Sequence, residues 1–208
     1  MKLFYSPTSP FARKVLVCAT EHELLNGLKL VQLHPLQDAE AVAAVTPLGK
    51  VPALQTETGR LIVDSPLICE YLDRQAVSSG GQSFIPSTTH TPELADDDAR
   101  VHALADGLMD AAYLHVMESN RQPEQQSPLW KDRWRNAIHR TLTFLETEYT
   151  NERLPSNLTM GGIALGCALG YLDFRLADMN WRDTHPALID FYRPLSERKS
   201  FIDSTPSS

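Results

Sequence analysis

Short apolar runs alternate with amphipathic stretches along the first third of the chain. Runs rich in Val, Leu, Phe and Tyr are typical of β-strands, and they predict strands over residues 2–5, 28–33, 52–56 and 60–64. Ser9 and Ser65 each precede a proline and an amphipathic stretch, the pattern of a helix cap followed by the first helical position. A short helix is also predicted over residues 38–45. The predicted order is strand, helix, strand, helix, strand, strand, helix, and the last helix ends near Arg74.

The pattern changes after residue 77. Residues 78–90 lie in a stretch rich in Ser, Thr, Gly and Pro, which breaks every periodicity and is typical of a linker. Beyond this stretch, apolar residues recur at helical spacing, and they predict helices over residues 93–119, 128–150, 159–178, 186–197 and 198–203. We therefore predict an α/β domain over residues 1–77 and an all-helical domain over residues 91–208.

Composition narrows the class of protein. A hydrophobic content of 42% is sufficient for a sizeable core. Cys18, Cys69 and Cys167 are widely spaced inside apolar stretches, which predicts buried thiols and neither a disulfide framework nor a metal site. The net charge of −7 argues against a nucleic-acid surface, and no window approaches the roughly 18 apolar residues of a membrane span. We expect a cytoplasmic protein with no metal, nucleic-acid partner or membrane segment.

Ser9 is the first candidate for chemistry. The amino end of a helix offers unpaired backbone N–H groups and a partial positive charge, which together favour an anion. If a thiol substrate lay over Ser9, the hydroxyl would donate a hydrogen bond to the thiolate and lower the thiol pKa. Ser9 would then activate the nucleophile without being the nucleophile itself. The alternative is that Ser9 only caps its helix, which is the common role of an isolated Ser-Pro pair.

Pro52 begins an apolar segment, and a strand with proline inside it cannot be central in a sheet. A cis bond at this proline would turn the backbone of Val51 outward, where it can pair with a peptide-like ligand. On the residues alone, an ordinary trans proline at a strand edge is the more common arrangement. Further along, Ser65 at a second helix start offers a hydroxyl and an N–H group to a carboxylate, and Asp64 can pair with an amino group. Simple capping is again the alternative for this pair.

Four motifs occur in an order that carries a resemblance: SPTSPFARKV, TPLGKVPAL, DSPLICEYL and IALGCALGYLDFR. Together they resemble the cytosolic glutathione S-transferase family, and they are especially similar to its bacterial members with a Ser-Pro-Phe active-site segment. The resemblance covers nearly the whole chain. It implies a thioredoxin-like, glutathione-binding domain with a mixed four-stranded sheet, followed by an all-helical domain that carries the second-substrate side. It also implies a cis Pro52 and a homodimer.

Site residues follow from the resemblance. It places the glutathione thiol near Ser9, the cysteinyl backbone against Val51 beside Pro52, and the γ-glutamyl end at Asp64 and Ser65. Lys50 would approach the glycine carboxylate, or would simply be a solvated lysine, and His34 is a weaker candidate. The candidate walls for a small hydrophobic electrophile are Phe11, Met109, Tyr113 and Tyr171, although such residues at helical spacing more often belong to a core. Asp106 would reach the glutathione amino group across the dimer, or would be an exposed helix charge.

The resemblance also sets the functional alternatives. Relatives with Cys in the place of Ser9 can form a mixed disulfide with glutathione, whereas Ser9 cannot, so conjugation or peroxide reduction is favoured over thiol transfer. Tyr5 ranks second as thiol activator because it lies within a predicted strand. The leading interpretation is a glutathione transferase with glutathione as its co-substrate. The alternative is a regulatory or binding protein that keeps the fold without catalysis. A glutathione-dependent isomerase or lyase would use the same first site.

Thr159 begins the buried helical stretch that contains IALGCALGYLDFR. Relatives commonly carry a capping box here, in which an acid or amide three residues after the cap returns a hydrogen bond. Gly162 stands at that position and cannot return it. We therefore expect lower stability, or slower folding, than in a relative with an intact box.

Overall fold

The computed structural model describes residues 1–151 and 158–206, which fall into two compact units. Unit 1 comprises Met1–Ile85 together with the segment from Lys199 onward, and unit 2 comprises Pro86–Arg198. The division differs from the boundaries expected from the sequence in one respect. The last segment of the chain groups with the first unit, because its helix packs on α1 (Pro10–Glu21).

Unit 1 contains the elements in the predicted order. After β1 (Lys2–Tyr5) and α1, they are β2 (Lys29–Gln32), α2 (Ala39–Val45), β3 (Ala53–Gln55), β4 (Leu61–Ile62), α3 (Ser65–Ser78) and, from the end of the chain, α8 (Lys199–Asp203). Two boundaries differ from the prediction. The cap of α3 is Asp64, with Ser65 as the first helical residue, and α3 continues four residues beyond Arg74.

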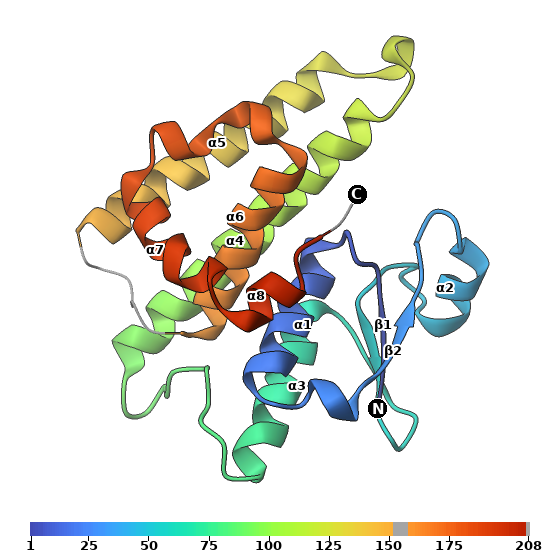
Figure 1. The fold of residues 1–208 in the computed structure, drawn as a ribbon. Helices are drawn as coiled ribbons and strands as arrows, with labels where there is room; N and C mark the ends of the chain where they lie inside the picture. The colour runs from blue at the N-terminus through green and yellow to red at the C-terminus, as the bar shows by residue number, and fades with distance from the viewer. Residues whose placement is uncertain (152–157, 207–208) are drawn as a thin grey trace. The chain divides into compact units, whose positions relative to one another are not determined.

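The four strands form one mixed sheet in the order β2-β1-β3-β4. β1 pairs in parallel with β2, whereas β3 runs antiparallel to both β1 and β4. A proline inside a strand was expected to exclude that strand from the centre of the sheet. β3 is central, but it begins at Ala53, so Pro52 lies just outside it and the rule is not violated. The sheet lies between α2 on one face and the pair α1 and α3 on the other (Figure 1).

The core of unit 1 forms where α1 and α3 cover the sheet. Val15, Cys18 and Ala19 recur at helical spacing on α1 and are fully buried, as are Ile68 and Leu72 on α3. At the carboxyl end of α1, His22 Nε2 lies 3.1 Å from Asp73 Oδ1. Burial by itself would raise the pKa of Asp73, but the neighbouring His22 ring and the hydrogen bonds donated by Ser83 and the Phe84 N–H lower it below its usual range. This pair therefore ties α1 to α3.

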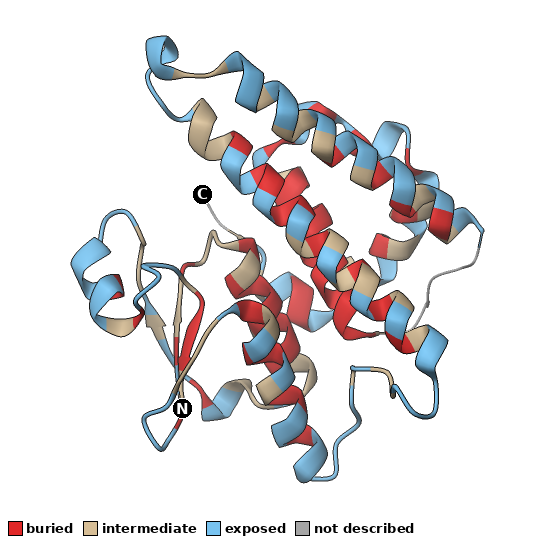
Figure 2. Cartoon of the chain, turned by 180° about the vertical axis from the view of Figure 1, so that it is seen from behind, coloured by how far each residue is buried: buried red, intermediate tan, exposed pale blue. Residues whose placement is uncertain are grey.

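Unit 2 is all helical. Its long helices are α4 (Pro92–Ser119), α5 (Pro128–Thr150), α6 (Met160–Arg175) and α7 (Pro186–Ser196). Residues Met160–Leu172 of α6 are all buried, and Figure 2 shows buried residues gathered where α4 and α6 pack together. α6 ends at Arg175, three residues before the predicted end, and short 3-10 turns follow over Ala177–Met179 and Trp181–Asp183.

The amino end of α6 has a cap that draws on another helix. Thr159 Oγ1 accepts a hydrogen bond from the Gly162 N–H (3.1 Å), as predicted, and no side chain at residue 162 can answer it. The buried Asp98 of α4 accepts a hydrogen bond from the Gly161 N–H (2.9 Å). Its carboxylate thus satisfies one of the free N–H groups at this helix end.

Two other expectations can be compared with the structure directly. Cys18, Cys69 and Cys167 are buried, as predicted. Burial and the neighbouring Cys69 thiol both raise the pKa of Cys18, with the hydrogen bond to Cys69 the larger cause, so this thiol is held in its protonated form. No helix in the part of the chain that the structure describes is long and apolar enough to cross a membrane.

Candidate functional site

Three connections of unit 1 meet at one edge of its sheet, which we call the Ser9 edge. β1 ends at this edge and leads through Ser6–Ser9 into α1. β3 runs antiparallel to β1 and therefore begins here, directly after Val51 and Pro52. β4 runs antiparallel to β3 and ends here, two residues before Asp64. Strand direction alone thus brings together residues from three separate parts of the sequence.

Ser9 is the cap of α1. Its backbone is extended (φ −82°, ψ 122°), and its Oγ accepts a hydrogen bond from the Ala12 N–H at 3.2 Å. Its own N–H donates to the Ser6 carbonyl (3.0 Å), and its carbonyl accepts from the Arg13 N–H (3.0 Å). A hydroxyl has one proton and two lone pairs, so accepting from Ala12 leaves the proton free to be donated elsewhere. Capping and thiol activation are therefore compatible roles for one side chain.

The Val51–Pro52 peptide bond is cis, as the resemblance implies. Pro52 is buried and Val51 is half-buried. Gly49, which follows an exposed turn at residues 47–48, has a φ of +61°. A left-handed backbone suits glycine, so the turn can deliver Val51 to the Ser9 edge without strain from a side chain.

Asp64 and Ser65 form the start of α3. Asp64 occupies the cap position, its side chain makes no cap hydrogen bond, and its backbone follows a second cis peptide bond, Val63–Asp64. The exposed Asp64 carboxylate is thus available to a ligand's amino group. The Asp64 carbonyl accepts from the Ile68 N–H, while the N–H of Ser65 belongs to the unpaired first turn and suits a carboxylate.

Four further candidate residues of unit 1 differ in their exposure and in their contacts. Lys50 is exposed. His34 Nδ1 accepts from the Leu36 and Gln37 N–H groups, both at 3.3 Å, so this nitrogen shapes the turn before α2. Tyr5 is the last residue of β1, where its Cα pairs with that of Gln32. Phe11 is half-buried in the first turn of α1.

The second-substrate candidates of unit 2 differ in accessibility. Met109 is fully buried and Tyr171 is 4% exposed, so both belong to the helical core, which was the stated alternative. Burial also raises the pKa of Tyr171, which keeps its hydroxyl neutral. Tyr113 is 39% exposed and remains on the surface. Helical spacing could not separate these cases, because it identifies a shared face without showing what covers it.

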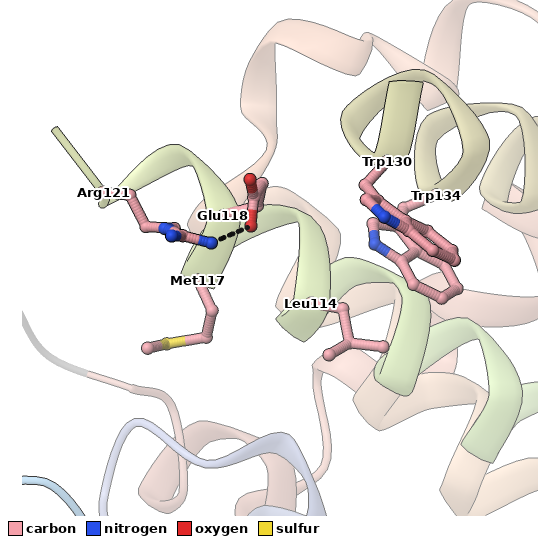
Figure 3. Close-up of a pocket in the computed structure, with 6 residues that line it drawn as sticks. All are labelled: Leu114, Met117, Glu118, Arg121, Trp130 and Trp134. Carbon is pink, nitrogen blue, oxygen red and sulfur yellow. Dashed lines mark hydrogen bonds and ion pairs between the residues drawn. The ribbon is translucent and has the colours of Figure 1, made fainter. Parts of the chain in front are cut away.

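An apolar hollow on unit 2 involves residues that the sequence did not single out. It measures about 470 Å³ and is lined by Leu114, Met117, Glu118, Arg121, Trp130 and Trp134 (Figure 3). The two indole rings are stacked with centroids 5.4 Å apart. Arg121 pairs with Glu118 at the rim (3.4 Å). The available signal was Leu-Trp and Trp at helical spacing near the start of α5, a pattern equally typical of a core.

Asp106 lies on α4 and is half-buried. Its Oδ2 is 3.6 Å from His102 Nε2, one turn earlier on the same helix.

In residues 1–151 and 158–206, no group of three His, Cys, Asp or Glu side chains is arranged to hold a metal ion.

Comparison with known proteins adds to this geometry. Residues 8–75 match the family model for the glutathione S-transferase N-terminal domain, and residues 128–193 match that for the C-terminal domain. The GST-like protein YibF of Escherichia coli (strain K12) is 36% identical over 211 residues, covering 99% of this chain and 98% of its own.

Solved structures show the same likeness. A glutathione transferase family member from Pseudomonas fluorescens Pf-5, with bound glutathione, is 37% identical with a TM-score of 0.90, covering 100% of this chain and 99% of that one. The corresponding structure with bound S-(propanoic acid)-glutathione has a TM-score of 0.86 at 37% identity and covers both chains fully. The predicted fold class, a thioredoxin-like domain followed by an all-helical domain, is confirmed.

Proposed function

Because this chain belongs to the glutathione S-transferase family, we propose that it binds glutathione at the Ser9 edge and activates its thiol for attack on a hydrophobic electrophile or hydroperoxide. The observation that carries the proposal is the geometry of Ser9. Its Oγ caps α1 through a lone pair and keeps its proton available beside the positive end of the helix.

The chemistry follows from that hydrogen bond. Ser9 would donate to the glutathione sulfur, and the bond is stronger to the thiolate than to the thiol, so the thiol pKa falls. The thiolate sulfur then forms a bond to the electrophilic carbon, and the leaving group departs with the electron pair of its own bond. With a hydroperoxide, the thiolate attacks oxygen, and a second glutathione completes the reduction to the alcohol, water and glutathione disulfide.

Binding would use the other two connections of the Ser9 edge. The backbone of Val51, turned by the cis bond to Pro52, would pair with the cysteinyl backbone of glutathione as an added strand. The carboxylate of the γ-glutamyl group would accept hydrogen bonds from the Ser65 hydroxyl and N–H. The amino group of the γ-glutamyl group would pair with the Asp64 carboxylate. The Lys50 ammonium group would pair with the glycine carboxylate of glutathione. The bound glutathione and S-(propanoic acid)-glutathione of the Pseudomonas fluorescens relative support this ligand class and a product substituted at sulfur.

A Ser9→Ala variant tests the proposal. It removes the donor to the thiolate but few contacts to the rest of glutathione, so glutathione affinity should change little. A hydrogen bond to a charged group contributes about 1.5–3 kcal/mol, so turnover with an aryl halide should fall roughly tenfold to a hundredfold. The matched control is Ser78→Ala, an exposed serine at the end of α3, which should leave both quantities unchanged.

Each contrary result has a definite meaning. Unchanged turnover in Ser9→Ala would remove Ser9 from the mechanism and make Tyr5 the next variant to examine. Retention of the native chain on immobilised glutathione without turnover against aryl halides, epoxides, peroxides or disulfides would favour a binding or regulatory protein. Failure to bind glutathione at all would reject the proposed function.

A further inference from the structure

Arg13 is an unusually placed cation of unit 1. It is on α1, one turn after Ser9, and only 6% of its surface is exposed. A buried guanidinium is strongly unfavourable unless its N–H groups find acceptors. Two acceptors of its guanidinium lie 188 and 191 residues further along the chain: Nη2 donates to the Phe201 carbonyl (3.0 Å) and Nε donates to Ser204 Oγ (3.3 Å). The Arg13 guanidinium also lies over the Phe201 ring, 5.5 Å from its centroid.

A second contact holds the other end of the same helix. Ser200 Oγ donates to the Glu21 carboxylate, and Glu21 is the last residue of α1. Ser200 thus lies by the carboxyl end of α1 while Ser204 lies by its amino end, so α8 runs antiparallel along α1. Phe201, between them, is 1% exposed. We call Arg13, Phe201 and Ser204 the Arg13 clasp.

The clasp acts on the turn that carries Ser9. The Arg13 N–H donates to the Ser9 carbonyl (3.0 Å), and the preceding Ala12 N–H donates to Ser9 Oγ. A rigid guanidinium bound at two nitrogens restricts its own backbone more than a lysine would, because lysine donates from a single nitrogen. The first turn of α1 is therefore tied to the carboxyl-terminal segment as well as to its own helix.

We propose that Arg13 is a positioning residue, and that its clasp on α8 holds Ser9 in the geometry required to hydrogen-bond the glutathione thiolate. The catalytic part of this inference rests on the proposed function, whereas the mechanical part rests only on the contacts within unit 1. The carboxyl-terminal segment is then a component of the thiol-activating site, although none of its residues meets the substrate.

The test uses the full chain with Arg13→Met, which keeps the apolar stem and removes the donors. Amide hydrogen exchange should become about tenfold or more faster at residues 12 and 13, since hydrogen bonds from a charged group are lost. Exchange in α6 of unit 2 should not change. In the same variant, the apparent pKa in the pH profile of kcat should rise, and kcat should fall by more than KM for glutathione rises.

Three further variants separate loss of the Arg13 clasp from a general effect of removing an arginine. Arg74→Met removes an exposed arginine on α3 that pairs with its helix neighbour Glu70, and it should leave exchange and pH profile as in the native chain. Arg13→Lys should recover part of both effects. If Arg13→Met proves too unstable, Ser204→Ala removes the Nε partner, together with the hydrogen bond from Ser204 Oγ to the Ser200 carbonyl (2.6 Å), and should show smaller changes in the same direction.

The outcomes separate the two proposals. Unchanged exchange at residues 12 and 13 in Arg13→Met would overturn the clasp, whatever the activity. Faster exchange with an unchanged pH profile would make Arg13 a stability residue and overturn its positioning role. If the native chain neither binds nor conjugates glutathione, the proposed function and the catalytic part of the clasp both fail, while the exchange measurement still decides the mechanical part.

Discussion

Ser9 shows how one residue can satisfy two demands. Pro10 lacks an N–H and suits the first helical position, so the helix start is determined by two adjacent residues. The cap uses an oxygen lone pair, and the proposed chemistry uses the hydroxyl proton. A cysteine at this position would offer a weaker acceptor to the cap and an attacking sulfur to the ligand. The serine therefore agrees with a site that activates another molecule's thiol.

Asp98 provides a prediction about stability and pH. Burial raises the pKa of its carboxyl, and hydrogen bonds with Thr159 and the Gly161 N–H only partly oppose this. Between the ordinary pKa of about 4 and the raised value, the folded chain binds more protons than the unfolded chain. The contribution of Asp98 to the free energy of unfolding is therefore fully present below pH 4 and is lost as the pH rises through the raised pKa.

An Asp98→Asn variant should remove this dependence. Urea unfolding across a pH series should show that the variant gains stability relative to the native chain as the pH rises above about 4. Asp96→Asn, an exposed neighbour on the same helix, should run parallel to the native chain throughout. Parallel curves for Asp98→Asn as well would show that its carboxyl titrates normally.

At the scale of elements, the contact of α4 with α6 depends on Gly161. A Cβ at this residue would lie 2.4 Å from the Asp98 carbonyl oxygen and 2.6 Å from Asp98 Oδ1. The first of these atoms is backbone and cannot rotate away. We expect Gly161→Ala to lower the free energy of unfolding by about 2–3 kcal/mol, as overpacking does.

Gly107 is the matched control for this substitution. It is an exposed residue inside α4, and a Cβ there would meet nothing within 4 Å. Gly107→Ala should therefore raise the free energy of unfolding by about 0.5–1 kcal/mol, because alanine loses less backbone entropy in a helix. Urea denaturation of both variants measures the contrast. A loss of stability in both would assign the effect at Gly161 to something other than the Asp98 contact.

The elements that the sequence predicted well are those with local signals. Ser9-Pro10 marks the start of α1, and Pro128 and Pro186 each stand first in their helices. The start of α3 was placed one residue late, because Asp64 and Ser65 are both good caps and no local rule separates them. The carboxylate at the amino end of α6 could not be foreseen, since Asp98 is 63 residues from Gly161.

The candidate site residues show the same difference between local and long-range signals. The order of strands brings Ser9, Val51, Pro52, Asp64 and Ser65 to one edge, and these residues were named from motifs whose spacing is local. Met109 and Tyr171 were named from helical periodicity, which is the same for a cavity wall and for a core. The contacts of Arg13 with α8 had no sequence signal, because they join residues 188 and 191 positions apart.

At the scale of the whole molecule, two segments that are far apart in the sequence form one unit. Unit 1 is assembled from the first 85 residues and from the segment that starts at Lys199. Phe201 is buried in this unit, so the core of the thioredoxin-like part includes a residue that follows the entire helical unit in sequence. The two consecutive domains expected from the sequence therefore separate α8 from the unit in which it packs.

A second copy of the chain is the remaining whole-molecule question, and we propose a homodimer on the basis of the family resemblance. Large apolar side chains are exposed on both units, including Leu67 of α3 and Leu129 and Trp130 of α5, which are 52%, 75% and 47% exposed. Sedimentation equilibrium should therefore give twice the mass of one chain.

Asp106 links this assembly to the ligand. If its carboxylate reaches the glutathione amino group of the partner, Asp106→Asn should weaken glutathione binding severalfold while the dimer persists, since an ion pair is lost. Asp96→Asn, on the same helix, should leave binding unchanged. A monomer at all concentrations would end the proposed cross-subunit role of Asp106. A dimer with unchanged affinity in Asp106→Asn would keep the assembly and reject the residue.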